Sequence, residues 1–273
     1  MILEMACQSV LKKKMNNKLL VNINNLADIE TYKKIGITNF LFAVKDFSLS
    51  NHTFNLSELK ALNINIYLNF NRILDTKEIE AFKKIKKDLS FASGILYEDL
   101  GIYQVLKDSK IPLIWNQKHF VINSRSINFW LERVDSAVIS NELTKDEIKS
   151  ILENTQKPLI IPIFGYNQAM YARRKLLTSF GKAKKIKTNY EAHLVINDKH
   201  AFNTKEIGNE TVFNYHLPFN YLPYLKDFKE DKIKFYLIDS DDKPEDIIKL
   251  INGHHITSNE QFLSNKTIYK LED

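Results

Sequence analysis

Cysteine is nearly absent from this sequence, because Cys7 is the only one in 273 residues. An internal disulfide is therefore excluded, and so is any zinc or iron–sulfur site built from several cysteines of this chain. No cofactor is otherwise indicated. A reducing, cytoplasmic setting is the default expectation for such a composition.

Glycine and proline are also scarce, with 7 and 6 residues, which excludes collagen-like tracts and long flexible linkers. No apolar run approaches the roughly 18 residues that a membrane span needs, so we expect no membrane partner. The segment from Met1 to Cys7 carries an acid and lacks the basic leader of a signal peptide. Because the first strand-like run begins at Lys18, we expect Met15 to be the true start. Residues 1–14 would then be a disordered extension before a single domain over 15–273.

The charge balance is basic, with a formal net charge of +6 and an isoelectric point near 9.0. Such a balance is compatible with an acidic partner such as tRNA. It is equally typical of a lysine-rich surface encoded by an AT-rich genome. Charge alone does not separate the two interpretations.

Short apolar runs alternate with helical patterns along the chain. Eight runs are predicted to be strands: 18–23, 39–44, 64–68, 94–97, 112–115, 137–140, 159–164 and 233–238. Nearly continuous apolar runs are typical of parallel strands covered by helices. The alternation predicts a (β/α)8 TIM-like barrel, and an open doubly wound sheet is the alternative. Extended runs between about 190 and 216 predict a β-hairpin insertion before the last strand.

Helix starts are marked by capping patterns. Asp75 precedes an amphipathic segment that runs towards Lys87, and Thr144 with Glu147 forms a capping-box pattern. The last helix is expected to open at Asp242, with a proline in its first turn.

Polar residues that follow the predicted strands are the candidates for a site, since barrels place their active sites at the carboxyl ends of the strands. Asp99, Glu142 and His119 are the candidate catalytic residues. The candidate substrate-binding residues are Glu98, Asn116, Gln117, Asn123, Tyr166 and Arg173. The acids could instead cap the helices that follow them, and a lone histidine is more often structural.

A basic stretch follows the seventh strand. Arg173 and Arg174 are predicted to lie in a helix, where guanidinium groups could bind phosphate or carboxylate or could form a solvated face. Lys182, Lys184, Lys185 and Lys187 are predicted to lie in a loop. With Arg174, they are the candidate RNA-binding residues, and solvated surface is again the alternative.

The seven histidines form no metal-binding pattern, and no metal site is predicted. Phosphate-binding glycine loops, nucleophile elbows and HExxH motifs are missing from the sequence. Cys7 lies in the expected extension, which argues against a cysteine protease.

Four segments in the middle of the chain resemble the peptidase U32 (collagenase-like) family. They are 94–101 (GILYEDLG), 112–117 (PLIWNQ) with Asn123, 140–148 (SNELTKDEI) and 164–177 (FGYNQAMYARRKLL). A looser similarity extends the resemblance over about residues 18–255. The chain is similar to the short members of Gram-positive-type bacteria that lack a cysteine cluster.

The resemblance implies a TIM-like barrel and two alternative activities. One is a peptidase, and the other is tRNA wobble-uridine hydroxylation, with tRNA, a small anionic metabolite and a longer U32 paralogue as partners. Three positions depart from the family pattern: Phe164 replaces a histidine, Ala172 a serine and Asn141 an arginine. These replacements weaken a hydrolytic mechanism and leave open a non-catalytic partner subunit.

Overall fold

The computed structural model describes residues 15–196, 200–258, 260 and 262–264. The extension predicted for 1–14 lies outside the described residues. The strands are β1 (Leu19–Asn22), β2 (Asn39–Ala43), β3 (Asn65–Phe70), β4 (Gly94–Tyr97), β5 (Leu113–Trp115), β6 (Ser136–Ala137), β7 (Leu159–Gly165), β8 (Gln168–Ala172), β9 (Glu191–Ile196), β10 (His200–Ile207), β11 (Glu210–Tyr215), β12 (Phe219–Asn220) and β13 (Ile233–Asp239). The α-helices are α2 (Asp28–Lys33), α3 (Leu56–Lys60), α4 (Thr76–Ile85), α5 (Leu100–Leu106), α6 (Ser124–Leu131), α7 (Lys145–Asn154), α8 (Leu176–Lys184) and α9 (Pro244–Ile251).

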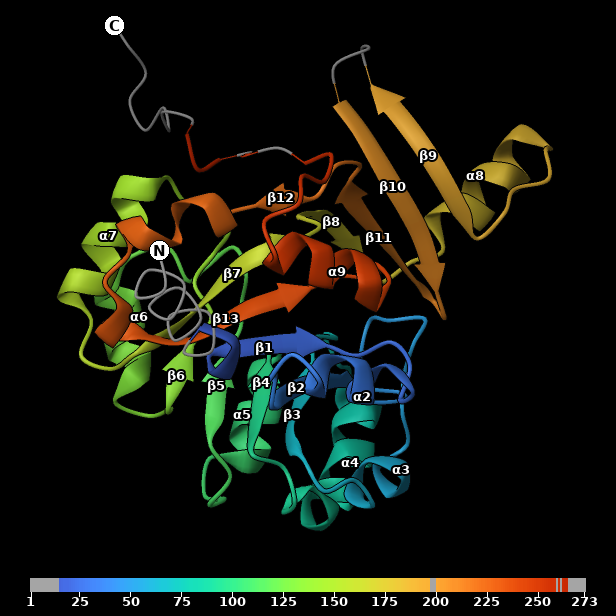
Figure 1. The fold of residues 1–273 in the computed structure, drawn as a ribbon. Coiled ribbons are helices and arrows are strands. Elements are labelled where there is room, and N and C mark those ends of the chain that lie inside the picture. Colours follow the sequence, from blue (N-terminus) through green and yellow to red (C-terminus); the bar gives the residue numbers. More distant parts are fainter. Residues whose placement is uncertain (1–14, 197–199, 259, 261, 265–273) are drawn as a thin grey trace, which may run out of the picture.

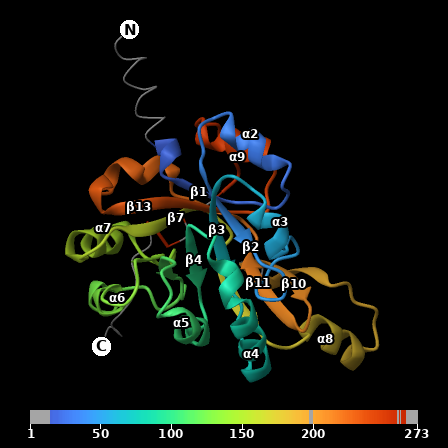
Figure 2. The ribbon, with the colours of Figure 1, turned by 90° about the horizontal axis from the view of Figure 1, so that it is seen from below.

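A nine-stranded, mostly parallel sheet forms the body of the protein. Its order is β12-β7-β13-β1-β2-β3-β4-β5-β6, and only the short β12 runs antiparallel to its neighbour. The sheet curls so strongly that a parallel bridge joins Val138, just after β6, to Ile160 of β7. Helices α2 to α7 lie around the outside (Figures 1 and 2). The architecture is α/β and consistent with a TIM-like barrel.

The side chains of each strand alternate between two apolar clusters. The inner cluster fills the curl of the sheet and consists of Leu20, Leu41, Tyr67, Leu96, Ile114, Val138, Ile160 and Leu237. Their neighbours, such as Leu19 and Val21 of β1, belong to the larger cluster that includes helix residues. Apolar residues are buried on both sides of the strands, which explains the continuous runs in the sequence.

The capping patterns are confirmed. Asp75 accepts a hydrogen bond from the amide of Glu78 at the start of α4, and Thr144 forms the same box with Glu147 at α7. The last helix begins at Pro244 with Lys243 as its N-cap, one residue after the expected opening at Asp242. None of the helices in the described ranges is long and apolar enough to cross a membrane.

A second, antiparallel sheet stands beside the first, in the order β8-β11-β10-β9 (Figure 1). It includes the two extended runs expected between 190 and 216, but it already starts at Gln168. The helix predicted for Arg173 and Arg174 is therefore wrong: β8 pairs with β11, and helix α8 starts only at Leu176. The loop predicted for the lysines is also wrong in part, because Lys182 and Lys184 lie in α8.

Candidate functional site

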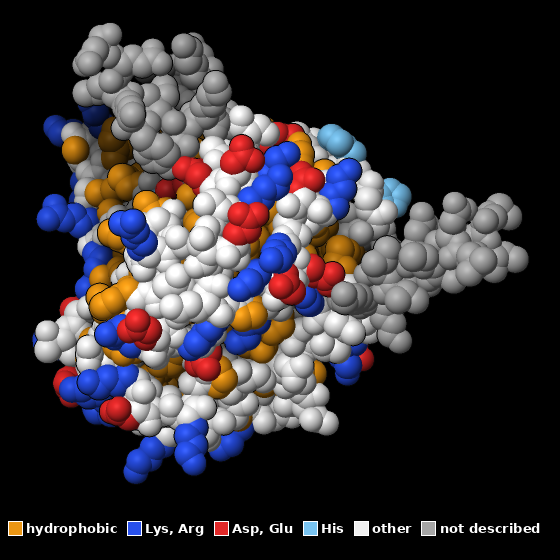
Figure 3. All heavy atoms as spheres, turned by 90° about the vertical axis from the view of Figure 1, so that its left-hand side faces the viewer, with side chains coloured by type: hydrophobic (Ala, Val, Ile, Leu, Met, Phe, Trp, Pro, Cys, Tyr) orange, Lys and Arg blue, Asp and Glu red, His pale blue; other side chains and the backbone are white. Residues whose placement is uncertain are grey.

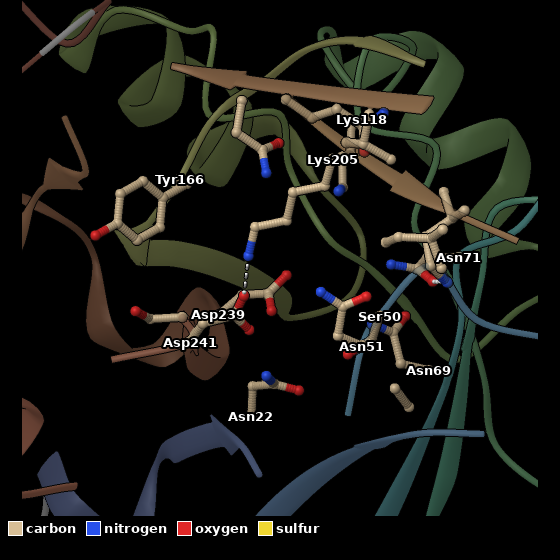
Figure 4. A pocket seen from close by; sticks show the side chains of 17 residues that line it. Asn22, Ser50, Asn51, Asn69, Asn71, Lys118, Tyr166, Lys205, Asp239 and Asp241 are labelled. Atoms are coloured by element: carbon tan, nitrogen blue, oxygen red, sulfur yellow. Dashed lines mark hydrogen bonds and ion pairs between the residues drawn. The ribbon is translucent and has the colours of Figure 1, made fainter. Parts of the chain in front are cut away.

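A polar cavity lies at the carboxyl ends of the parallel strands, between the two sheets (Figure 4). The space within it, open solvent included, is about 770 Å³, and a smaller hollow of about 430 Å³ on the same measure adjoins it. The two hollows share Lys118, Tyr166, Gln168 and Asp239. This is the rim at which barrel enzymes bind their substrates.

Strand ends supply one wall of the cavity. Asn22 ends β1, Asn69 lies near the end of β3, Asn116 follows β5 directly, and Asp239 ends β13. Parallel strands end at the same edge, so residues distant in sequence meet there. The Asn69 side chain is buried, and its Oδ1 atom has no hydrogen-bond partner. A buried acceptor without a partner is costly and marks a place where a ligand or water is expected.

The antiparallel sheet supplies the opposite wall. Lys205 and Ile207 of β10 line the cavity together with Val212 and Asn214 of β11. These residues are spaced by two along each strand, so they project from the same face of the sheet. Gln168 of β8 completes this wall. The cavity therefore depends on the docking of one sheet against the other.

Lys118 lines both hollows and contributes positive charge to the site. Its Nζ atom is 3.7 Å from Oε1 of Glu98, a side chain that is almost fully buried behind the cavity wall. Burial, opposed by the charge of Lys118, raises the pKa of Glu98 to about 7. Asp239 lines both hollows, and desolvation also raises the pKa of its carboxyl. Glu98 can thus hold or release a proton near neutral pH, which is the property that acid–base chemistry requires.

Two further polar groups face the cavity. Lys205 Nζ lies 3.4 Å from Oδ2 of Asp241, as Figure 4 shows. The hydroxyl of Tyr166 lies 3.5 Å from Oδ1 of Asp242, and burial, together with that carboxylate, raises the pKa of Tyr166 to about 12. The tyrosine is therefore a neutral donor, and Lys205 is partly neutralised by an acid.

An ion-pair network joins the two sheets beside the cavity. Glu210 of β11 is only 3% exposed at its side chain and accepts hydrogen bonds of 2.8 Å from Nε of Arg72 and 2.9 Å from the hydroxyl of Tyr171. Arg72 also pairs with Glu78 at 2.8 Å, and Arg173 pairs with the same Glu78 at 2.8 Å. The guanidinium of Arg173 thus connects β8 to helix α4 rather than lining the cavity.

The predicted site residues are only partly brought together. Tyr166 lines the cavity, Asn116 lines the smaller hollow beside it, and Glu98 contacts Lys118. Asp99 is the N-cap of α5, where its carboxylate accepts from the amides of Gly101 and Leu74 at 2.6 and 2.8 Å. Asn123 is the N-cap of α6. The capping role left open for Asp99 is therefore the one observed.

The remaining predicted residues lie at the edge of the site. Gln117 donates to the carbonyl oxygen of Glu98 at 2.8 Å and accepts from the indole of Trp115 at 3.0 Å. His119 Nδ1 lies 2.9 Å from Oε2 of Glu142, a pair that is partly exposed to solvent. Two of the three candidate catalytic residues thus touch each other.

The basic candidates lie apart from the cavity. Arg174, Lys182, Lys184, Lys185 and Lys187 are exposed residues of α8 and its flanks. Among the described residues, none of these five takes part in an ion pair.

Sequence reasoning missed two lysines. Lys118 stands between Gln117 and His119, directly after the fifth strand, so its position carried the same signal as its neighbours. Lys205 lies in β10, which no strand-end argument reaches. Within the described ranges, no group of three or more His, Cys, Asp or Glu side chains is placed to hold a metal ion.

Comparison with known proteins gives a family. A search of curated proteins found no match. The family model for Peptidase family U32 matches residues 42–253, which is more than half of the chain and includes β3 to β13. This protein is therefore a member of peptidase family U32.

Proposed function

We propose that this protein takes part in the hydroxylation of the wobble uridine of tRNA, and that its cavity receives the uracil base. The proposal joins the activity that the family resemblance implies to the chemistry of the cavity wall. A base must leave its stack before an enzyme can act on it, and it then enters a pocket that reads its edge.

The observation that carries the proposal is the row of amides at the strand ends. Asn22, Asn69, Asn116 and Asn214 line the two hollows, and each amide offers both donors and an acceptor. The imide edge of uracil presents one N–H between two carbonyl oxygens, which amides can match. An amide oxygen of this row would accept the base N–H. The ring of Tyr166, on the other side of the cavity from Asn69, offers a surface against the base (Figure 4).

A small anionic metabolite is the second ligand that we propose. Lys118 faces both hollows and would contact it, rather than Arg173, whose guanidinium is engaged by carboxylates. Protonation of Glu98, whose pKa is about 7, would leave the charge of Lys118 available to the anion. Binding should therefore strengthen as the pH falls through neutrality.

The same proposal includes a closed barrel fold and a cytoplasmic location. The Val138–Ile160 bridge supports a closed eight-stranded barrel with the antiparallel sheet as an insertion. A reaction on tRNA implies a cytoplasmic protein. A longer U32 paralogue would be its partner if the chain is a non-catalytic subunit, and the two would then co-purify.

Deletion of the gene followed by mass spectrometry of tRNA nucleosides tests the function. We expect hydroxyuridine to fall, and to be restored by the wild-type gene and by Asn63→Ala, which changes an exposed asparagine. Asn69→Ala, at the cavity, should not restore it. Unchanged hydroxyuridine in the deletion strain would refute the proposal.

A peptidase is the second candidate, and the hydrogen bond between His119 and Glu142 favours it. A carboxylate on Nδ1 orients an imidazole for acid–base work. Purified protein would be incubated with gelatin and mixed peptides, with and without divalent metals. Cleavage that His119→Ala abolishes would support this candidate, and no cleavage under any condition would remove it.

A further inference from the structure

The segment 173–190 is basic and contains no acidic residue. Its seven basic residues are Arg173, Arg174, Lys175, Lys182, Lys184, Lys185 and Lys187. Arg173 pairs with acids of the sheet junction, whereas the other six are exposed and take part in no ion pair with the described residues. Their charge is therefore available to a partner.

Large apolar side chains are exposed within the same segment. Phe180 is 52% exposed, Ile186 54% and Tyr190 70%. Phe180 and Lys184 are four residues apart in α8, so they lie next to each other on one side of the helix. An aromatic ring beside an ammonium group fits a nucleotide, which combines a flat base with a phosphate.

The segment has a fixed conformation that holds these groups in place. The chain reverses at Lys185, which adopts a left-handed conformation with φ of 54°, and the amide of Ile186 donates to the carbonyl of Gly181 at 3.0 Å. Thr188 then donates to the carbonyl of Leu177 at 3.2 Å. A side chain at position 181 would collide with Thr188, so the returning chain lies directly against α8.

This charge distribution is not general to the molecule. Figure 3 shows Lys and Arg intermixed with Asp and Glu on the face that carries α6 and α7. In Figure 1 that face is opposite to α8. The segment 173–190 thus forms a local basic surface, which we call the α8 surface.

We propose that the α8 surface binds unpaired nucleotides of RNA, with Phe180 and Tyr190 stacking on bases and the lysines contacting phosphates. The proposal extends the function proposed above by naming the RNA element that is recognised. Exposed rings favour unpaired nucleotides because the bases of a duplex are already stacked. The surface is the connection between β8 and β9 of the sheet whose strands β10 and β11 wall the cavity, so RNA bound here lies beside the cavity-forming unit.

The aromatic part is tested by fluorescence anisotropy with a fluorescein-labelled oligouridylate of about twelve nucleotides, about the upper range that one small nucleic-acid-binding domain covers. We expect Phe180→Ala and Tyr190→Ala each to weaken binding by about tenfold, a typical effect of losing one base–ring stack. Phe129→Ala is the matched control, since Phe129 is 54% exposed on α6, away from the α8 surface. Circular dichroism spectra would establish that the variants fold.

The charged part is tested by salt dependence. The double variant Lys182→Gln/Lys184→Gln should lower the slope of log affinity against log salt by about 1.4, because each lost phosphate contact removes about 0.7. Lys107→Gln/Lys110→Gln makes the same charge change at exposed positions after α5 and should leave the slope unchanged. This pair of variants keeps the test valid even if an aromatic variant fails to fold.

Three results would overturn the proposal. They are no binding of the oligouridylate, binding that all the variants leave unchanged, or, in a parallel sedimentation assay, binding only to vesicles that contain anionic lipid. Failure of the proposed function is distinguishable: if hydroxyuridine persists without the gene while the α8 variants still weaken RNA binding, the binding surface stands and the reaction does not.

Discussion

The junction between the two sheets allows a sharp test through Glu210→Gln. The wild-type carboxylate accepts from Arg72 with both oxygens at 2.8 Å and from Tyr171 at 2.9 Å, and it lies 3.7 Å from Arg173. Glutamine has nearly the same shape but no charge. It would also turn an amide donor towards a guanidinium that can only donate.

The expected loss of stability follows from the burial of the Glu210–Arg72 pair. Glu210 is 3% and Arg72 18% exposed at the side chain, so the pair is largely shielded from water. Removing one partner of a buried pair costs about 3–5 kcal/mol. We take about 3 kcal/mol, because Arg72 keeps its pair with Glu78. For a protein of this size, that corresponds to a fall in Tm of roughly 6–12 °C.

Urea unfolding and thermal scans of the purified variant measure the effect, with hydrogen exchange at β11 to locate it. Glu80→Gln is the matched control. Glu80 pairs with Lys83 at 2.6 Å, but its side chain is 60% exposed, so the loss should stay within about 0.5 kcal/mol. If Glu210→Gln is as mild as Glu80→Gln, the argument that this network holds the sheets together is wrong.

Three further outcomes are expected. Because the pKa of Glu98 rises from 4.5 to about 7 on folding, this one carboxyl should contribute a loss of about 3 kcal/mol of stability as pH rises from 4.5 to 7. Glu98→Gln should lack this loss in urea unfolding at several pH values, and parallel curves for both proteins would contradict the burial of the carboxyl. Thr144→Ala should lower the free energy of unfolding by about 1 kcal/mol through loss of the α7 cap, and Ser150→Ala, within the same helix, should not. Gly165→Ala should cost about 3 kcal/mol or more, since φ is 156° and a Cβ would collide with the carbonyl oxygen of Asp239; a Tm equal to that of the wild type would disprove the contact.

Most of the parallel strands could be predicted because their signal is local. The apolar runs at 159–164 and 233–238 became β7 and β13, since residues on both sides of each strand are buried. The capping box at Thr144 is equally local, as it needs only two side chains three residues apart.

The antiparallel sheet was predicted less well because its pairing is not local. β8 (Gln168–Ala172) contains Met170 and two alanines, which suit a helix, and none of its residues is buried. It is a strand because β11, some forty residues later, pairs with it. The helix expected across Arg173 followed from local preference, which this tertiary pairing overrode.

The candidate cavity lies at the edge of the parallel sheet where the site was expected, but only some of the expected residues line it. The rule that site residues follow strand ends identified Asn116 and the residues on either side of Lys118. It could not give the direction of each side chain, because that depends on the turn that follows the strand. Asp99 turned to the amides of Leu74 and Gly101. Residues of the opposite wall, such as Lys205, come from a different sheet, and no sequence spacing relates them to the strand ends.

A cavity whose walls belong to two sheets has a thermodynamic consequence. A molecule that touches Asn69 on one side and Lys205 on the other adds its own contacts to those that keep the sheets associated. Linkage is reciprocal, so docking of the sheets strengthens binding by the same factor by which the occupant strengthens docking. Arg72 and Glu210 touch neither hollow, yet a variant that leaves part of the molecules with undocked sheets would lower the apparent affinity in proportion to the docked fraction.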